Sequence, residues 1–232
     1  TRVRSSAASD VYKRQVLMRA LVVYCHPTEG SFNAAIRDLV MAKLQAAGAE
    51  VRLHDLYGDG FQPILTSAEW RGYLDTAQNC VPVTREVGDL RWCDTLIFIY
   101  PTWWYGLPAI LQGWLDRVLL PDVAFLMPDG ANKTIRPGLN HINRLGVFTT
   151  CGASRLLTWF VGAPGKRTLT RGIGLLLKPR KRSVFAAHYL MDSSTPESRQ
   201  RHLHRVAAKM DKLIGRSVPA PIPQPQPARV TS

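Results

Sequence analysis

Short apolar runs alternate with amphipathic stretches along most of the chain. "ALVVYC" (20–25), "DTLIFIYP" (94–101) and "RLGVFTTC" (144–151) have the length and composition of strands that are buried on both faces. "EVRLHDL" (50–56) and "RSVFAAHYL" (182–190) predict two more strands. Strands that alternate with helices predict a parallel sheet covered on both faces, which is a doubly wound α/β fold of five strands.

Between these runs the apolar residues recur at helical spacing. A helix is predicted from Ser31, which can cap it, to Gly48, which closes it. Thr195 and Pro196 are typical of the cap and first position of another helix. That helix is predicted over 195–214. The other predicted helices cover 66–77, with Thr66 or Ser67 as cap, a stretch that ends near Trp92, and 107–120.

The two ends of the chain differ from this pattern. Residues 1–17 precede Met18 and contain no apolar signal-peptide core, so we expect a non-native or disordered extension there. Prolines at alternate positions in 216–232 predict an extended, disordered tail. The predicted domain is therefore 18–215.

Composition narrows the class of protein. A chain of 232 residues with 46% hydrophobic content can bury one sizeable core. Its apolar runs are shorter than the roughly 18 residues that suggest a membrane span. The four cysteines are widely spaced and form no C-x-x-C pair. We read them as reduced thiols of a cytoplasmic protein and expect no metal site.

The net charge of +13 is unevenly distributed. Eight basic residues and no acidic residue lie between Arg155 and Arg182. Such a stretch attracts phosphates, nucleic acid or an anionic membrane, and a plain basic surface is an equal alternative. "KPRKRS" lacks interleaved aromatic residues, so we expect no nucleic-acid partner. Peripheral contact with an anionic membrane stays open.

Three unusual segments follow predicted strands. They are "HPTEGSFN" (26–33), "PTWWYG" (101–106) and "TTCGAS" (149–154). Ligands of doubly wound sheets bind beyond the carboxyl ends of the strands, so the fold brings these segments to one edge. We therefore expect one ligand to contact all three.

The first segment suits an anion. Ser31 can cap the helix, the first-turn amides of Phe32 and Asn33 can face a phosphate, and His26 can add a hydrogen bond or a charge. The alternatives are a plain helix cap and an ordinary loop histidine.

The other two segments suit a planar ring. The amides of Trp103 to Tyr105 can bond the edge of a ring while an indole packs on its face, and Gly152 allows the backbone to approach it closely. Such amides raise the electron affinity of a ring that gains negative charge on reduction. The alternative is that the aromatic residues only cap the core. A flavin meets all of these demands.

Four segments resemble those of a known enzyme family. "HPTEGSFNAA", "DLYGDGFQPIL", "YPTWWYGLPAILQGWLDRV" and "TTCGAS" are similar to the flavodoxin-like NAD(P)H:quinone oxidoreductases of the DT-diaphorase type, which include bacterial drug-modulator and potassium-efflux ancillary reductases. The resemblance covers most of 20–155. It implies a flavodoxin-like sheet of strand order 2-1-3-4-5, FAD (with FMN as the alternative), NAD(P)H as hydride donor, and a homodimer with sites at the subunit interface. NAD(P)H would reduce the flavin and leave before a quinone takes both electrons.

Carried over by position, the resemblance implies two sets of cofactor contacts. The flavin phosphates would be held by His26, Ser31, Phe32 and Asn33. The isoalloxazine would be bordered by Pro101, Thr102, Trp103, Trp104, Tyr105, Thr149, Thr150, Cys151 and Gly152.

This chain departs from the family in two places. The tyrosine and histidine that follow the "TTGG"-type segment are absent, and Arg155 is our candidate to stabilise negative charge on the reduced flavin. The substrate-side tyrosines are replaced by Phe125 and Met127, which keep an apolar slot for a flat acceptor. Charges in 155–182 that contact a 2′-phosphate would favour NADPH over NADH.

Two functions are consistent with these observations. The first is a cytoplasmic flavoenzyme that makes two-electron reductions of quinones or similar acceptors. The alternative is a flavin-binding ancillary subunit of a membrane transporter. The sequence contains no G-x-S-x-G motif, and we expect "HLH" (202–204) to be exposed on a polar helix rather than to bind a metal.

Overall fold

The computed structural model describes residues 18–215. The extension predicted at 1–17 and the tail predicted at 216–232 lie outside the described residues.

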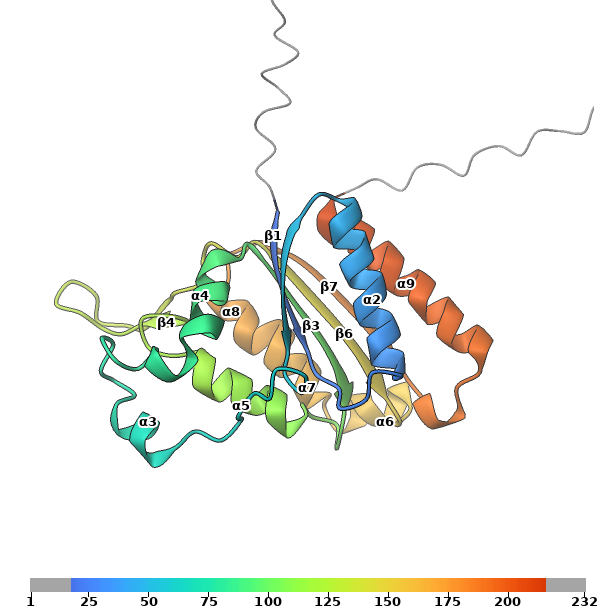
Figure 1. Cartoon of the computed structure of the whole chain (residues 1–232), viewed down its shortest axis with the longest axis horizontal. Helices are drawn as coiled ribbons and strands as arrows, with labels where there is room; N and C mark the ends of the chain where they lie inside the picture. The colour runs from blue at the N-terminus through green and yellow to red at the C-terminus, as the bar shows by residue number, and fades with distance from the viewer. Residues whose placement is uncertain (1–17, 216–232) are drawn as a thin grey trace, which may run out of the picture.

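A central sheet of five parallel strands carries the fold (Figure 1). Its order is β2-β1-β3-β6-β7, which is the predicted order 2-1-3-4-5, so both the strands and the doubly wound topology are confirmed. The strands are β1 (Arg19–Tyr24), β2 (Glu50–Asp55), β3 (Thr95–Thr102), β6 (Arg144–Cys151) and β7 (Arg182–His188).

Strand β1 shows why both faces of the sheet need a cover. Leu21 and Val23 belong to the core on one face, whereas Val22 and Tyr24 belong to the core on the other. Successive side chains of a strand point to opposite faces. A continuous apolar run is therefore stable only when helices pack on both sides.

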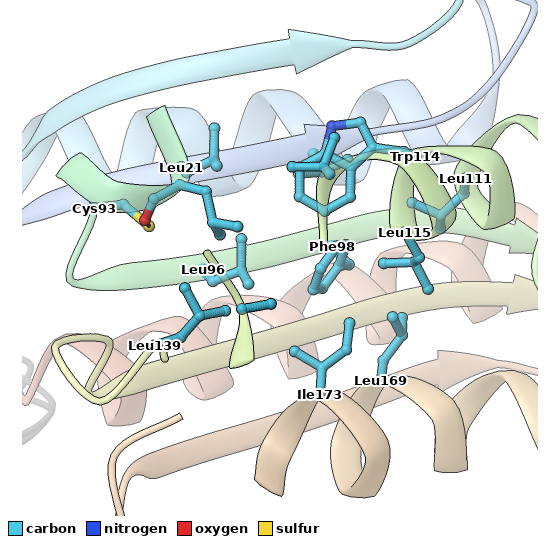
Figure 2. Close-up of a cluster of buried hydrophobic side chains, with 14 of the residues drawn as sticks. Leu21, Cys93, Leu96, Phe98, Leu111, Trp114, Leu115, Leu139, Leu169 and Ile173 are labelled. Atoms are coloured by element: carbon cyan, nitrogen blue, oxygen red, sulfur yellow. Dashed lines mark hydrogen bonds between the residues drawn. The ribbon is translucent and has the colours of Figure 1, made fainter. Parts of the chain in front are cut away.

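One face is covered by α4 (Thr84–Trp92), α5 (Ala109–Val118) and the π-helical η3 (Thr168–Ile173). Figure 2 shows Phe98 of β3 among side chains from α5 and η3, including Leu169. Trp114 of α5 is fully buried and meets Phe98 edge-on, with 6.0 Å between the ring centroids. Trp114 is thus a core residue.

The opposite face is covered by α2 (Phe32–Ala46) and α9 (Pro196–Ile214), which lie side by side (Figure 1). Ile36 and Leu44 of α2 and Val206 and Met210 of α9 are fully buried in this core. An ion pair between Lys43 Nζ and Asp211 Oδ1, 2.8 Å apart, joins the two helices.

The predicted caps are confirmed, and two helices are shorter than expected. Ser31 caps α2, and Thr195 caps α9 with Pro196 in its first turn. Thr66 caps α3 (Ser67–Arg71), which ends six residues before the predicted end at 77. Pro108 is the N-cap of α5 rather than part of its first turn.

Several short elements have no counterpart among the expectations. Strands β4 (Phe125–Leu126) and β5 (Arg136–Pro137) form an antiparallel pair. The basic stretch 155–182 contains several short helices. The further short elements are η2 (Val81–Val83), α6 (Arg155–Phe160), α7 (Pro164–Arg167), α8 (Gly174–Leu176) and η4 (Met191–Ser193).

The expectation for "HLH" is wrong for its first histidine. His202 is only 1% exposed, whereas His204 is exposed. The face of α9 that contains His202 turns toward α2, where the ring centroids of His202 and Phe32 are 5.9 Å apart. Among residues 18–215, no helix combines the length and the apolar character needed to cross a bilayer.

Candidate active site

The three predicted segments meet at the carboxyl edge of the sheet around a cavity of about 640 Å³. Nine of the predicted cofactor residues line it. They are His26, Pro101, Thr102, Trp103, Trp104, Tyr105, Thr150, Cys151 and Gly152. Four lining residues were not predicted, namely Ala153, Leu157, Met191 and Asp192. Met191 and Asp192 follow β7, in a segment with no local signal for a ligand.

The first turn of α2 presents unused donors. The Ser31 hydroxyl accepts a hydrogen bond from the amide of Ala34 at 3.1 Å. The amides of Phe32 and Asn33 donate to no other described residue, as expected for the first positions of a helix. Free amides and the positive end of the helix dipole favour an anion here. Ser31 and Phe32 also line a second hollow of about 360 Å³ against Arg199 of α9.

The side chain of Asn33 ties this turn to β6. Its amide donates to the hydroxyl of Thr150 at 2.9 Å, and the whole residue is 2% exposed. The carbonyl oxygen of Asn33 is buried without a partner among the described residues. A buried acceptor of this kind normally has a partner, so a donor from a ligand is expected there.

His26 can offer a ring nitrogen to the cavity. Its Nδ1 lies 3.0 Å from both the amide nitrogen and the carbonyl oxygen of Thr28, so it accepts from the amide in one tautomer and donates to the carbonyl in the other. Burial lowers the pKa of the imidazole, and the hydrogen bond with Thr28 opposes this only partly. Nε2 can therefore act toward a ligand as a donor or as an acceptor.

The aromatic turn is strained. Trp104 and Tyr105 have φ values of 48° and 62°, which residues other than glycine and asparagine rarely adopt. The amide of Gly106 closes the turn by donating to the carbonyl of Trp103 at 3.0 Å. Positive φ at both central positions is typical of a type I′ turn, whose usual residues are Asn and Gly. Strain of this kind collects at functional sites.

This turn leaves both amides and rings free. The amides of Trp104 and Tyr105 donate to no other described residue. The side chain of Trp104 is 94% exposed and that of Trp103 is 42% exposed, so neither ring is a core residue. Both tryptophans line the cavity. The turn can therefore bond a ring edge and cover a ring face.

The end of β6 forms the opposite wall. Thr149 is buried and shares a 2.8 Å hydrogen bond between its hydroxyl and that of Thr102 on β3. A Cβ on Gly152 would lie 2.8 Å from Oδ2 of Asp192. Any larger residue at this position would therefore require the Asp192 side chain to move.

Seven predicted residues do not line this cavity. Four of them are cofactor candidates, namely Ser31, Phe32, Asn33 and Thr149, and of these Ser31 and Phe32 line the second hollow instead. Arg155 is exposed at the first position of α6 and does not line it. Phe125 of β4 and the nearby Met127 do not line it either. The described residues contain no cluster of side chains suited to a metal ion.

The donor set fits a flavin. Free amides at α2 suit its phosphate, and free amides in the aromatic turn suit the edge of its ring. The exposed indoles and the Cβ-free Gly152 leave a slot for a flat ring system. A doubly wound parallel sheet of order β2-β1-β3-β6-β7, with a cavity at the carboxyl ends of its strands, defines a protein of the flavodoxin-like class.

Comparison with known proteins agrees with this assignment to the flavodoxin-like class. The sequence profile of the family described as "Flavodoxin-like fold" matches residues 18–213, and the chain belongs to this family. The resemblance to NAD(P)H:quinone oxidoreductases is confirmed by its relatives. A ribosyldihydronicotinamide dehydrogenase [quinone] of Pongo abelii is 30% identical over 126 residues, 47% of this chain and 54% of the relative.

Two further proteins are similar. NAD(P)H dehydrogenase [quinone] 1 of Cavia porcellus is 32% identical over 125 residues, 47% of this chain and 46% of that enzyme. The chain thus spans about half the length of these two relatives. The crystal structure of Smu.1420 from Streptococcus mutans superposes with a TM-score of 0.71 at 29% identity, covering 83% of this chain and 98% of the other.

Proposed function

We propose that this protein is a flavin-dependent NAD(P)H oxidoreductase that makes two-electron reductions of quinones or similar flat acceptors. The observation that carries the proposal is one cavity bordered by His26, by the aromatic turn with its free amides and by the end of β6. The free amides of the first turn of α2 lie beside a second hollow, which Ser31 and Phe32 line. The names of the relatives, which are quinone dehydrogenases, support the choice of acceptor. A flavin held here would take a hydride from NAD(P)H and pass both electrons to the acceptor.

The residues of this chain bind the flavin and orient its ring. The amides of Phe32 and Asn33 hold the phosphate, and His26 offers Nε2 to the ligand. The amides of Trp104 and Tyr105 stabilise negative charge at the ring edge. Arg155 is the first residue of α6, directly after the β6 loop, and although it does not line the cavity we propose that it adds a positive charge near the reduced ring. An unchanged rate of flavin reduction in Arg155→Ala would remove Arg155 from this role.

We propose FAD rather than FMN. The second hollow lies between the first turn of α2 and α9, where Arg199 and Leu203 offer a cation and an apolar contact. FMN has no group to place there, whereas FAD has an adenosine and a second phosphate. Arg199→Gln should then weaken FAD binding by about tenfold and leave FMN binding unchanged. Equal losses for both flavins would favour FMN.

The open side of the cavity supports a homodimer. Trp104 lines the cavity and is almost fully exposed. In α6, Trp159 and Phe160 are 72% and 79% exposed and closely follow Leu157, which lines the cavity. Phe125 and Met127 do not line the cavity of their own chain. In a dimer, these residues of one copy would close the cavity of the other. Sedimentation should show a dimer whose dissociation constant rises on Trp159→Ser. Flotation of the protein with anionic vesicles would instead assign this face to a membrane.

The first experiment identifies the cofactor and the donor. The purified protein should be yellow, release FAD on denaturation, and bleach anaerobically with NADPH or NADH. The eight basic residues of 155–182 favour a higher kcat/KM with NADPH. A protein that binds neither flavin after reconstitution would refute the proposal. Reduced cysteines, all four unpaired, are consistent with action in the cytoplasm.

A further inference from the structure

A third hollow, with a polar lining, lies beyond the end of β7. It is distinct from the cavity at the carboxyl edge of the sheet and from the second hollow between α2 and α9. It measures about 310 Å³ and sits between the end of β7, the segment after it and α9. Its lining contains no carboxylate. The residues are Ala187, His188, Tyr189, Leu190, Ser193, Ser194, Ser198, Arg201, His202 and Arg205. Met191 and Asp192, between Leu190 and Ser193, line the flavin cavity instead.

Two histidines of this hollow have nitrogen atoms without partners. His202 is 1% exposed, and neither of its ring nitrogens has a hydrogen-bond partner among the described residues. His188 is 7% exposed and its Nδ1 also lacks a partner. The two rings meet edge-on with centroids 5.2 Å apart. Buried polar atoms without partners are costly, so a ligand that supplies acceptors or donors is expected.

Two arginines of α9 line the hollow together with the histidines. Arg201 and Arg205 are one turn apart on α9, and neither forms a hydrogen bond or a close ion pair with another residue of 18–215. Ser194 also lines the hollow, and its hydroxyl forms no hydrogen bond with another described residue. Arginine, serine and histidine donors without a carboxylate are typical of a phosphate site.

The surroundings of His202 and His188 disfavour positive charge on their rings. Burial, then the neighbouring His188 and Arg205, lower the pKa of His202 to about 4. Burial also lowers the pKa of His188, assisted by Arg205 and Arg199. The charged groups that act on the two histidines are basic, and the acidic Glu197, one turn before Arg201 on α9, interacts with Arg201 and Arg199 without lining the hollow. A bound anion would reverse this repulsion.

We propose that this hollow binds a phosphate group, as free phosphate or as the monoester end of a larger molecule. The donors are the guanidinium groups of Arg201 and Arg205, the hydroxyl of Ser194 and the imidazole of His202. A volume of about 310 Å³ exceeds that of one oxyanion, since a single water occupies roughly 30 Å³. The site therefore has room for the group that a phosphate ester carries. This proposal does not depend on the flavin chemistry.

Calorimetry on the flavin-loaded protein tests the proposal, since flavin occupies the phosphate turn of α2. Inorganic phosphate and 2′-AMP are titrated at constant ionic strength. We expect one saturable site, at least tenfold weaker in Arg201→Gln and Arg205→Gln. Lys212→Gln, the same change of charge on an exposed part of α9, should bind like the wild type. A tighter 2′-AMP would identify a monoester, and equal affinities would identify free phosphate.

Histidine resonances provide a second readout. Phosphate should raise the pKa of both His188 and His202 in the wild type, and the shift should disappear in Arg205→Gln. If the protein binds no flavin, two phosphate sites are expected, and Arg205→Gln removes only one of them. Absence of binding, or equal weakening by Lys212→Gln, would overturn the proposal.

Discussion

The side-chain amide of Asn33 donates a 2.9 Å hydrogen bond to the hydroxyl of Thr150. This buried bond joins the first turn of α2 to the end of β6, although the residues are 117 positions apart. It therefore sets the distance between the phosphate turn and the wall that borders the ring.

Thr150→Val tests this link. Valine keeps the shape of threonine but leaves the Asn33 amide buried without an acceptor, so we expect a loss of about 1–3 kcal/mol in the free energy of unfolding. Flavin affinity should fall as well. Urea denaturation and flavin titration measure the two effects. Thr170→Val, which removes a hydroxyl bonded to its own helix, should cost less than about 0.5 kcal/mol; similar losses in both variants would contradict the prediction.

Trp104→Asn should separate stability from binding. Asparagine tolerates positive φ, and the 94% exposed indole contributes little packing, so the variant should be as stable as the wild type or more stable by up to about 1 kcal/mol. Flavin binding should weaken because the indole is lost. Trp104→Val, which places a β-branched residue at positive φ, should be destabilised. Equal stability of Asn and Val would show that the turn stores no strain.

Gly113→Ala should destabilise the protein, although alanine favours helices. A Cβ at Gly113 of α5 would lie only 2.4 Å from the Cβ of Pro63 and would also clash with its backbone, so the loop before α3 must move. We expect a loss of more than about 2 kcal/mol in thermal or chemical denaturation. Gly88 lies in α4 with open space around its Cβ position. Gly88→Ala should therefore stabilise by about 0.5–1 kcal/mol, and the opposite order would refute this packing.

His202 should make the protein sensitive to mild acid. Its pKa is lowered to about 4 in the folded protein, so the fold prefers the neutral ring. This contribution is complete above the ordinary pKa of about 6.5 and is lost as the pH falls from about 6.5 toward 4, to a total of about 3 kcal/mol. His202→Leu should flatten the fall of unfolding free energy across this range in phosphate-free buffer. His204→Leu, on the exposed face, should keep the wild-type slope; a steep slope in His202→Leu would refute the assignment.

Much of the site could be predicted because its signals are local. The caps at Ser31 and Thr195 are set by side chains that bond amides three residues away. The aromatic turn follows directly from the end of β3, and parallel strands place their carboxyl ends together. Phe125 and Met127 do not line the cavity of their own chain, and their predicted role stays a prediction because the path of the chain after α5 depends on contacts between distant segments.

The sequence by itself determined the five strands, their order in the sheet through the resemblance, and the three segments at its carboxyl edge. Periodicity and capping act over a few residues, so the order of the chain is enough to express them. Only the tertiary structure decided that Asp192 faces Gly152 and that His202 is buried behind Phe32. Such contacts join side chains far apart in sequence, and their environment exists only after α2 and α9 pack on the sheet.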